Sequence, residues 1–384
     1  MRDAVIVEAV RTPVGKRKGV LAGVHPVDLS AHVLNALAER AGLTDPAEVD
    51  DVIWGCVSQV GEQTFDIARS AVLAAGWPQS VPGVTVDRQC GSSQQSVHFA
   101  AAGLVSGQYD LVVAGGVESM TRVPMGSTRA IGPGEPRGPQ VVARYPGTEF
   151  NQGEAAEMIA DRWGFSRTQL DEFSLVSHER AARSLDEGRF AGQIVPVPTE
   201  GGTVAVDEGV RRGGTVETMA GLRPAFRPDG RITAGNSSQI SDGASAVLIT
   251  TPEVAAANGW RPLARFHSFA LTGIDPVLML TGPIGATEKV LQRAGIGIDE
   301  VGTFEVNEAF ASVTLAWLAE TGVDPALLNP DGGAIALGHP LGCSGARLAT
   351  TLVHRMRREG IRYGLQTICE AGGMANAMLL ENLA

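Results

Sequence analysis

Two rounds of alternating strands and helices constrain what this chain of 384 residues can fold into. In the first round, residues 4–10 are a buried apolar run, and apolar residues recur at helical spacing over 29–41, with Asp28 as the predicted N-cap and Gly42 as the end. The segments DDVIWGCVSQ, GVTVDRQC and YDLVVAGGVESM are strand-like, and GSSQQSVHFAAAGLVSG, ended by Gly107, is typical of a helix. Strands that alternate with helices predict an α/β fold with a parallel or mixed sheet covered on both faces.

The second round begins at Pro262 and resembles the first. The strand-like segment DDVIWGCVSQ of the first round corresponds to EVGTFEVNEAFAS in the second round. The stretch from the strand before Cys90 to LVVAGG corresponds to LGCSGARLATTLVHRMRREGIRYGLQTICEAGG. We interpret this as a duplicated βαβαβ-type unit, with mixed sheets layered between helices. The length agrees, because single cores stop growing near roughly 250 to 300 residues.

The alternation is interrupted between the two rounds. Residues 121–145 are rich in Pro, Gly and Arg and predict no core element, after which helices resume in EAAEMIADRWGF and in SRTQLDEFSLVSHERAARSLDEG, capped by Ser166. We therefore expect an N-terminal half formed by 1–120 and 234–261, an inserted loop subdomain over 121–233, and a C-terminal half over 262–384.

Charge and cysteine usage exclude several classes of protein. A net charge of −11 argues against nucleic-acid and membrane-surface binding, which need a basic face. No segment approaches the ~20 apolar residues that span a bilayer, and the first residues are too charged for a secretory signal. Four widely separated cysteines without metal-site spacing fit a reducing compartment, so we expect a cytoplasmic protein.

Two motifs place reactive side chains at turns. Cys90, in VDRQCGSSQQ, lies where a predicted strand meets a helix, and the helix dipole there favours a thiolate. His339, in GGAIALGHPLGCSGAR, lies among glycines that allow close approach of a ligand, and it can accept a thiol proton. Taken singly, a cysteine here is more often a buried small residue and a histidine more often satisfied in a turn. We interpret Cys343 as structural.

Two further motifs follow predicted strands. Cys369, in TICEAGGMANAM, lies at the carboxyl end of a strand, where open α/β sheets place their ligands, and a second cysteine there can shuttle a proton. Asn307, in NEAFA, can orient a water or a carbonyl oxygen, although the same residues also suit an ordinary helix start.

Together these motifs give the chain an end-to-end resemblance to the thiolases, the acetyl-CoA C-acyltransferase and acetyltransferase family. AVIVEAVRTPVGK, GGVESMTRVP and RITAGNSSQISDGASAV add to it, in the family's order and spacing. The resemblance implies the thiolase fold and a two-step reaction in which 3-ketoacyl-CoA and CoA give acetyl-CoA and a shortened acyl-CoA, or the reverse condensation. Coenzyme A and acyl-CoA would be substrates and partners, with no metal, redox cofactor or other permanently bound cofactor.

The resemblance also implies roles for individual residues. Cys90 would carry the acyl group, His339 would activate it, and Cys369 would act as acid and base with an ordinary thiol pKa. One oxyanion hole would form from His339 and a water held by Asn307, and the other from backbone N–H groups of Cys90 and Ala371.

The inserted subdomain would hold CoA. By the same resemblance, Arg211 would lie near the adenine nucleotide and Ser238 near the pantetheine, while Phe226, Ala309 and Phe310 would line the channel. We interpret the nearby Arg212, Arg223, Arg227 and Arg231 as solvated surface residues.

Several residues depart from the family pattern. The usual Cys-Ala-Ser-Gly with a following apolar residue is replaced by Cys90-Gly91-Ser92-Ser93-Gln94, and the usual His-Met-Gly by Asn151-Gln152-Gly153. Glu370 and Ala371 replace an apolar residue and a glycine. Polar Gln94 and Gln152 near the acyl pocket suggest bulky 3-ketoacyl-CoA, including steroid side chains, with acetoacetyl-CoA as the alternative.

Other functions were weighed against thiolysis. A ketoacyl synthase shares the fold but pairs its cysteine with two histidines or with histidine and asparagine, which Cys369 disfavours. A noncatalytic acyl-CoA or sterol carrier, or a structural subunit of a β-oxidation complex, would be marked by loss of the cysteine or histidine. Thiolases are dimers or tetramers, so we expect a homodimer or homotetramer, with Ile131–Gly147 contributing to tetramer contacts.

Overall fold

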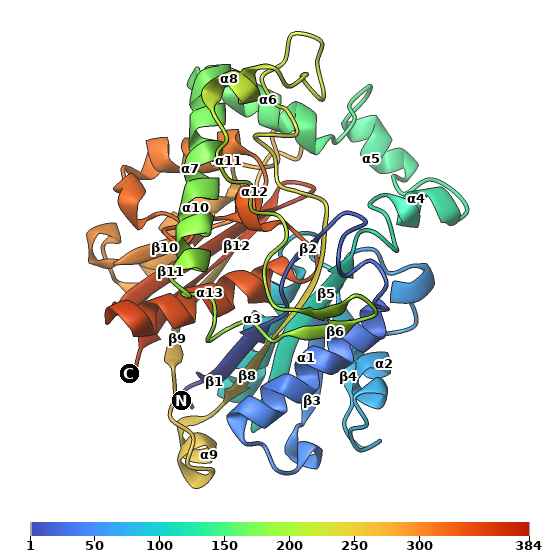
Figure 1. The fold of residues 1–384 in the computed structure, drawn as a ribbon, viewed down its shortest axis with the longest axis vertical. Helices are drawn as coiled ribbons and strands as arrows, with labels where there is room; N and C mark the ends of the chain where they lie inside the picture. The colour runs from blue at the N-terminus through green and yellow to red at the C-terminus, as the bar shows by residue number, and fades with distance from the viewer. Residues whose placement is uncertain (1, 384) are drawn as a thin grey trace.

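One mixed sheet of ten strands runs through the part of the chain that the computed structural model describes, residues 2–383. Its order is β10-β11-β12-β9-β1-β8-β5-β3-β4, with β2 paired to β8 (Figure 1). The strands are β1 (Val5–Arg11), β2 (Gly15–Lys16), β3 (Asp51–Gly55), β4 (Gly83–Val86), β5 (Leu111–Ser119), β8 (Ser241–Thr250), β9 (Ala264–Gly273), β10 (Thr303–Val306), β11 (Tyr363–Glu370) and β12 (Met374–Asn382).

The predicted duplication is visible in the strand directions. β3 and β5 are parallel, and β5, β8 and β1 follow with antiparallel pairings. The other half repeats this arrangement, because β10 and β11 are parallel and β11, β12 and β9 follow antiparallel. Within the described sheet, β1 and β9 join the halves through two residue pairs, Val5 with Arg265 and Ile6 with Ala264.

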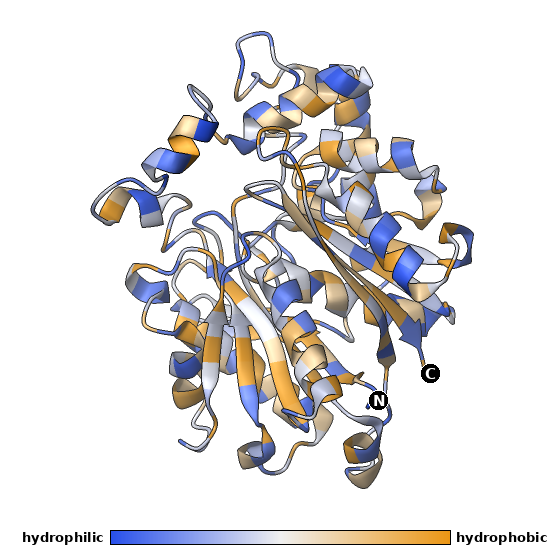
Figure 2. Ribbon diagram, turned by 180° about the vertical axis from the view of Figure 1, so that it is seen from behind, coloured by the Kyte–Doolittle hydropathy of each residue, from blue (hydrophilic) through white to orange (hydrophobic). Residues whose placement is uncertain are grey.

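Helices form layers around and between the two halves. α1 (Pro26–Ala41) and α2 (Ile67–Ala74) cover the outer face of the first half, and α10 (Gly282–Ala294) and α11 (Ala311–Thr321) pack against the second. Between the halves lie α3 (Ser92–Ser106) and α13 (Ser344–Glu359), which contact each other (Figure 1). Apolar residues follow the strands and the helix faces that cover them, so each half has its own core (Figure 2).

Short elements complete these layers. They are α9 (Pro252–Ala257), α12 (Ala334–Leu337) and the 3₁₀ turns Pro46–Glu48, Gly61–Gln63, Ile298–Glu300 and Pro325–Leu327. No helix in residues 2–383 has the length and apolar character needed to cross a bilayer.

The ends of α1 show one wrong prediction and one correct one. The N-cap is His25, whose Nδ1 accepts the Val27 N–H at 3.2 Å, and Asp28 lies instead in the first turn. Pro26 explains the shift, because its fixed φ suits the first helical position and sets the start three residues earlier. Gly42 ends the helix with φ of 68°, as predicted.

The segment between β5 and β8 is mostly helical. It contains α4 (Ser127–Ile131), α5 (Pro139–Arg144), α6 (Gln152–Trp163), α7 (Arg167–Asp186), the hairpin β6 (Val197–Thr199) and β7 (Gly202–Val204), and α8 (Val216–Ala220). Ser166 forms the predicted capping box at the start of α7. The structure has two short helices, α4 and α5, where no element was expected over 121–145, and they project from the body without buried residues (Figure 1).

Candidate active site

Cys90 lies on a tight turn between β4 and α3. The strand ends at Val86, earlier than the sequence predicted, and Gln89 then adopts φ of 49°, a left-handed conformation that costs energy for a residue with a side chain. Asp87 accepts the Gln89 N–H at 2.7 Å and so stabilises the turn. Gly91 is the N-cap of α3, which places Cys90 at the predicted junction of strand and helix.

The predicted thiolate at Cys90 is wrong. The side chain is only 5% exposed, and burial raises the pKa of this thiol well above its usual range, assisted by the charges that Cys369 and Glu370 would carry. Burial likewise raises the pKa of Cys369 to about 12, so the predicted ordinary value is wrong as well. Both sulfurs are resting thiols at neutral pH, and reaction requires a base beside them.

His339, the predicted base, is oriented by hydrogen bonds on both sides of its ring. Its Nδ1 lies 2.6 Å from the Ser344 hydroxyl, and this hydroxyl donates its own proton to the Pro340 carbonyl at 2.8 Å. The Nδ1 atom therefore carries the ring proton and donates it to Ser344. On the other side of the ring, the Asn307 amide nitrogen lies 3.4 Å from Nε2 and donates to it, which again requires a lone pair on Nε2.

The electrostatic environment keeps this imidazole neutral. Burial lowers the pKa of His339 to about 3, and the Arg347 charge adds to the effect. The ring is therefore neutral across the physiological pH range, and its Nε2 is unprotonated.

Two residues to which the sequence assigned no role hold the His339 loop. Ser344 orients the ring, and Glu118, in β5, accepts backbone N–H groups of Val57, Ser58 and Gly342 at 3.0, 3.1 and 2.9 Å. Glu118 thereby joins the loop after His339 to the loop after β3. Its sequence signal is an acidic residue in an otherwise apolar buried strand.

Cys369 and Ala371 lie at the end of β11, as predicted. Cys369 is the penultimate residue of the strand, and Ala371 begins the turn to β12. Cys369 belongs to the same apolar cluster as Ala309 and Phe310. The preceding residue, Ile368, packs in the small cluster that contains Cys90. The end of β11 therefore lies between the nucleophile turn and the predicted CoA channel.

Four of the five predicted CoA contacts form one continuous wall. The Ser238 N–H donates to the Ala309 carbonyl at 2.9 Å, and Phe310 meets the Phe226 ring edge to face with centroids 6.0 Å apart. The wall also reaches His339, because the carbonyl of Gln239 accepts the His339 N–H at 3.3 Å.

Arg211, the fifth predicted contact, faces an open hollow beside this wall. The hollow has a volume of about 400 Å³ and is lined by Arg211, Ser238, Lys16 and Arg17, of which the sequence had singled out only the first two. Arg211 has no ion pair within residues 2–383, whereas Arg212 is paired with Asp186 at 2.7 Å. Lys16 is paired with Glu208 at 3.2 Å, so Arg211 and Arg17 are the lining cations without an ion pair in residues 2–383. Cations around a hollow suit a phosphate-bearing ligand.

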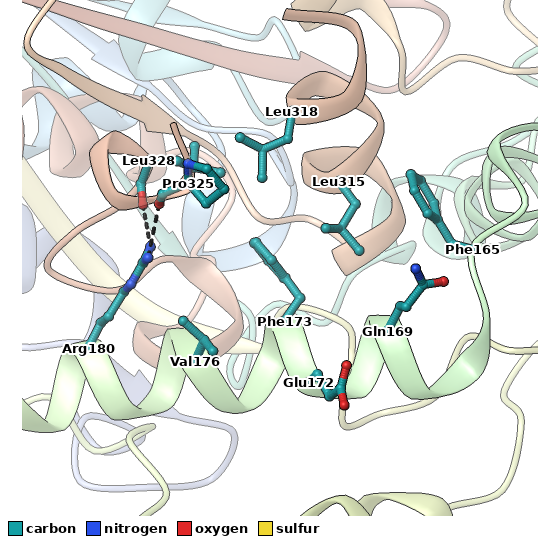
Figure 3. A pocket seen from close by; sticks show the side chains of 10 residues that line it. All are labelled: Phe165, Gln169, Glu172, Phe173, Val176, Arg180, Leu315, Leu318, Pro325 and Leu328. Atoms are coloured by element: carbon teal, nitrogen blue, oxygen red, sulfur yellow. Dashed lines mark hydrogen bonds between the residues drawn. The ribbon is translucent and has the colours of Figure 1, made fainter. Parts of the chain in front are cut away.

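A second, apolar hollow of about 320 Å³ lies between α7 and α11 (Figure 3). Phe173 and Val176 of α7 face Leu315 and Leu318 of α11, and Arg180 closes one end by donating to the Pro325 carbonyl at 2.9 Å. None of the four predicted catalytic side chains lines it.

Gln94 does not take the position that the sequence predicted for it. Its side chain is fully buried between α3 and β11, where its carbonyl oxygen accepts the Gln366 amide at 2.8 Å. It therefore joins two elements of the core and does not line an acyl pocket.

A duplicated, layered α/β fold with a cysteine at the start of the central helix defines the class of enzymes that transfer acyl groups from thioesters or condense them. Within that class, the sequence matches the thiolase N-terminal domain over residues 4–253 and the thiolase C-terminal domain over residues 260–382.

Similar proteins agree with this assignment. The chain is 50% identical, over its full length and 95% of the other protein, to a steroid 3-ketoacyl-CoA thiolase of Mycobacterium tuberculosis. It is 43% identical to a 3-ketoacyl-CoA thiolase of Bacillus subtilis, with 99% and 100% of the two chains covered. The crystal structure of an acetyl-CoA acetyltransferase of Bacillus anthracis superimposes with a TM-score of 0.91 at 37% identity, covering 100% and 99% of the chains.

The chain belongs to the thiolase family. It is an acyltransferase that cleaves 3-ketoacyl-CoA thiolytically, and the family assignment decides against the ketoacyl synthase considered from the sequence.

Proposed function

We propose that thiolysis proceeds through an acyl group carried on Cys90, with Cys369 as the proton shuttle. His339 Nε2 removes the Cys90 proton, and the sulfur attacks the 3-keto carbon of the substrate. The bond between C2 and C3 breaks, and the acetyl-CoA enolate takes its proton from Cys369. The resulting Cys369 thiolate then deprotonates incoming CoA, whose sulfur attacks the acyl-Cys90 thioester. The shortened acyl-CoA is released, and the departing Cys90 thiolate regains its proton from His339.

The observation that carries this proposal is the hydrogen bonding of His339. Ser344 on one side of the ring and Asn307 on the other both require a free Nε2 lone pair. After proton transfer the same Nε2–H becomes a donor, so His339 and an Asn307-held water form one expected oxyanion hole. The backbone N–H groups of Cys90 and Ala371 form the other.

CoA is proposed to bind along the wall of Ser238, Ala309, Phe310 and Phe226, with its phosphates toward Arg211. The geometry supports this because the segment that carries Ser238 and Gln239 contacts both Ala309 and His339. The wall therefore leads from the cationic hollow to the base.

We further propose bulky 3-ketoacyl-CoA, such as a steroid side-chain thioester, as the substrate class. The name of the Mycobacterium tuberculosis relative supports it, while the acetyl-CoA acetyltransferase neighbour favours acetoacetyl-CoA as the second candidate. The expected role of Gln94 no longer contributes to this argument.

The test is intact-protein mass spectrometry after mixing with acetoacetyl-CoA or with a long-chain or steroid 3-ketoacyl-CoA. We expect an acyl adduct on the native chain that Cys90→Ala abolishes and that Cys343→Ala retains, since Cys343 is a buried thiol outside the proposed machinery. The mass of the adduct identifies the preferred acyl group. Absence of an adduct with every substrate would favour a noncatalytic carrier or structural subunit.

We also propose that the chain forms a homo-oligomer and that it works in the cytoplasm. A homodimer or homotetramer is supported by exposed apolar side chains, Val84 on edge strand β4 and Ile131 and Val142 on the projecting α4 and α5. Light scattering that reports a monomer would contradict this. The four buried free thiols support the reducing cytoplasm.

A further inference from the structure

Gly91 and Glu370 lie against each other beside the nucleophile, although 279 residues separate them in the sequence. A Cβ built on Gly91 would lie 2.8 Å from the carboxyl carbon of Glu370 and closer still to one of its oxygens. The usual alanine of the family therefore cannot stand at position 91 while Glu370 keeps its place. The two departures from the family pattern are complementary, because the volume missing at Gly91 is filled by the Glu370 carboxyl.

The surroundings of this carboxyl are buried and polar. Glu370 is fully buried, and within residues 2–383 neither of its carboxyl oxygens has a hydrogen-bond partner. Asn376, the neighbour on β12, donates its amide to the Gly91 carbonyl at 3.3 Å. The side chains of Glu370 and Asn376 thus enclose the first residue after Cys90.

Burial also decides the charge of this group. It raises the pKa of Glu370 to about 8, against a lowering effect of Arg88 and with a further increase from Asp87. The carboxyl is consequently protonated at neutral pH, which agrees with its burial without a hydrogen-bonded cation.

We propose that Glu370 is a positioning residue for thiolysis, whose carboxyl packs on Gly91 and holds the turn that carries the Cys90 sulfur and backbone N–H. This inference rests on the proposed role of Cys90 as nucleophile. It adds a residue that does not touch the substrate but sets the place of the attacking atom.

The same contact makes Cys90 sensitive to ionisation of Glu370. The groups that bear on the two residues are Arg88 and Asp87 from the nucleophile turn, Cys369 from β11 and Glu118 from β5. A charged Glu370 disfavours the Cys90 thiolate, as does a charged Cys369. The effect appears only above about pH 8, where Glu370 ionises.

A double-mutant cycle tests the packing contact. We expect Gly91→Ala to lower kcat by at least about tenfold because the new methyl displaces the turn, and Gly91→Ala with Glu370→Ala to regain most of that loss, a coupling typical of residues in contact. KM for 3-ketoacyl-CoA should change little. Full activity of Gly91→Ala, or a double variant no faster than Gly91→Ala, would overturn the proposal.

Alkylation of Cys90 by iodoacetamide, followed by mass spectrometry of the Cys90 peptide, tests the charge effect even where Gly91→Ala does not fold. Glu370→Gln keeps the shape of the side chain without its charge. Its rate of Cys90 alkylation should equal that of the native chain near pH 6.5. Near pH 9.5 the rate of the variant should be about tenfold higher, which corresponds to a difference of one unit in the pKa of Cys90. Glu305→Gln is the matched control, because Glu305 is equally buried and has a pKa near 8 but does not bear on Cys90. Coincident profiles of Glu370→Gln and the native chain would refute the inference.

The two proposals fail separately. An acyl adduct that survives Cys90→Ala would remove the proposed nucleophile and, with it, the positioning role. If Cys90→Ala abolishes the adduct but the double-mutant cycle shows no coupling between Gly91 and Glu370, the positioning role alone would be refuted.

Discussion

Replacement of Ser344 by alanine tests the hydrogen bond that sets the tautomer of His339. The substitution removes the acceptor 2.6 Å from Nδ1, while the Asn307 contact to Nε2 at 3.4 Å is long and orients the ring only weakly. A single neutral hydrogen bond contributes about 0.5 to 1.5 kcal/mol, so kcat should fall by roughly 2- to 12-fold. KM should stay near its native value because Ser344 is fully buried and is not part of the proposed CoA-binding wall.

Ser30→Ala is a close structural match for this substitution. The Ser30 hydroxyl donates to the Pro26 carbonyl four residues earlier at 2.8 Å and accepts a ring N–H, that of Trp54, at 3.2 Å. Ser344 makes the same two kinds of bond, but its ring is the proposed base. Both variants should lose a similar amount of unfolding free energy in urea titrations, and only Ser344→Ala should lose kcat in steady-state thiolysis.

The size of the loss of kcat in Ser344→Ala distinguishes the possible roles of this serine. An unchanged kcat in Ser344→Ala would mean that the serine does not set the tautomer. A loss as large as that of His339→Ala would mean that Ser344 holds the whole loop in place. An equal loss of kcat in Ser30→Ala would assign the effect to general destabilisation.

Three further predictions concern the charged residues Arg211, Glu118 and Glu305. Arg211→Ala should raise KM for CoA by about tenfold and weaken its salt dependence, whereas Arg212→Ala, whose guanidinium is already paired, should change KM by less than about twofold. Glu118→Gln should lower the unfolding free energy by about 2 kcal/mol or more in urea titrations, because an amide N–H₂ would then face backbone donors. Burial raises the folded-state pKa of Glu305 to about 8, above its unfolded value, so its contribution to stability is present below pH 4.5 and lost as the pH rises to 8. Between these pH values Glu305→Gln should gain unfolding free energy over the native chain by up to about 1.4 kcal/mol per pH unit. Parallel curves of unfolding free energy against pH would contradict this.

The sequence predicted the positions of the reactive groups better than their charge. Cys90 and Cys369 follow from local patterns, because a strand-to-helix junction and the end of a strand are legible in the order of residues. The pKa of Cys90 depends on burial and on side chains hundreds of residues away, and the local helix start alone therefore predicted the wrong charge.

Residues that act through tertiary hydrogen bonds were the least predictable. Ser344 and Glu118 lie in motifs that were recognised. Their partners, however, are Nδ1 of His339 and backbone groups of two separate loops. Gln94 was assigned to the acyl pocket because it follows the nucleophile, but the approach of β11 places its amide against Gln366. In each case the deciding contact comes from another element of the fold.

The duplication brings together the two segments that carry Cys90 and His339. Cys90 precedes α3 and Cys343 precedes α13, so the two cysteines occupy equivalent places at the starts of the two central helices. These starts are bonded directly, since the Ser93 hydroxyl accepts the Ala346 N–H at 2.9 Å. Cys343 has no part in the proposed chemistry, and its neighbour Ser344 orients His339. The placement of the proposed nucleophile relative to the proposed base therefore depends on the packing of two equivalent helices, one from each half. A change at that contact should alter kcat before it alters the binding of CoA.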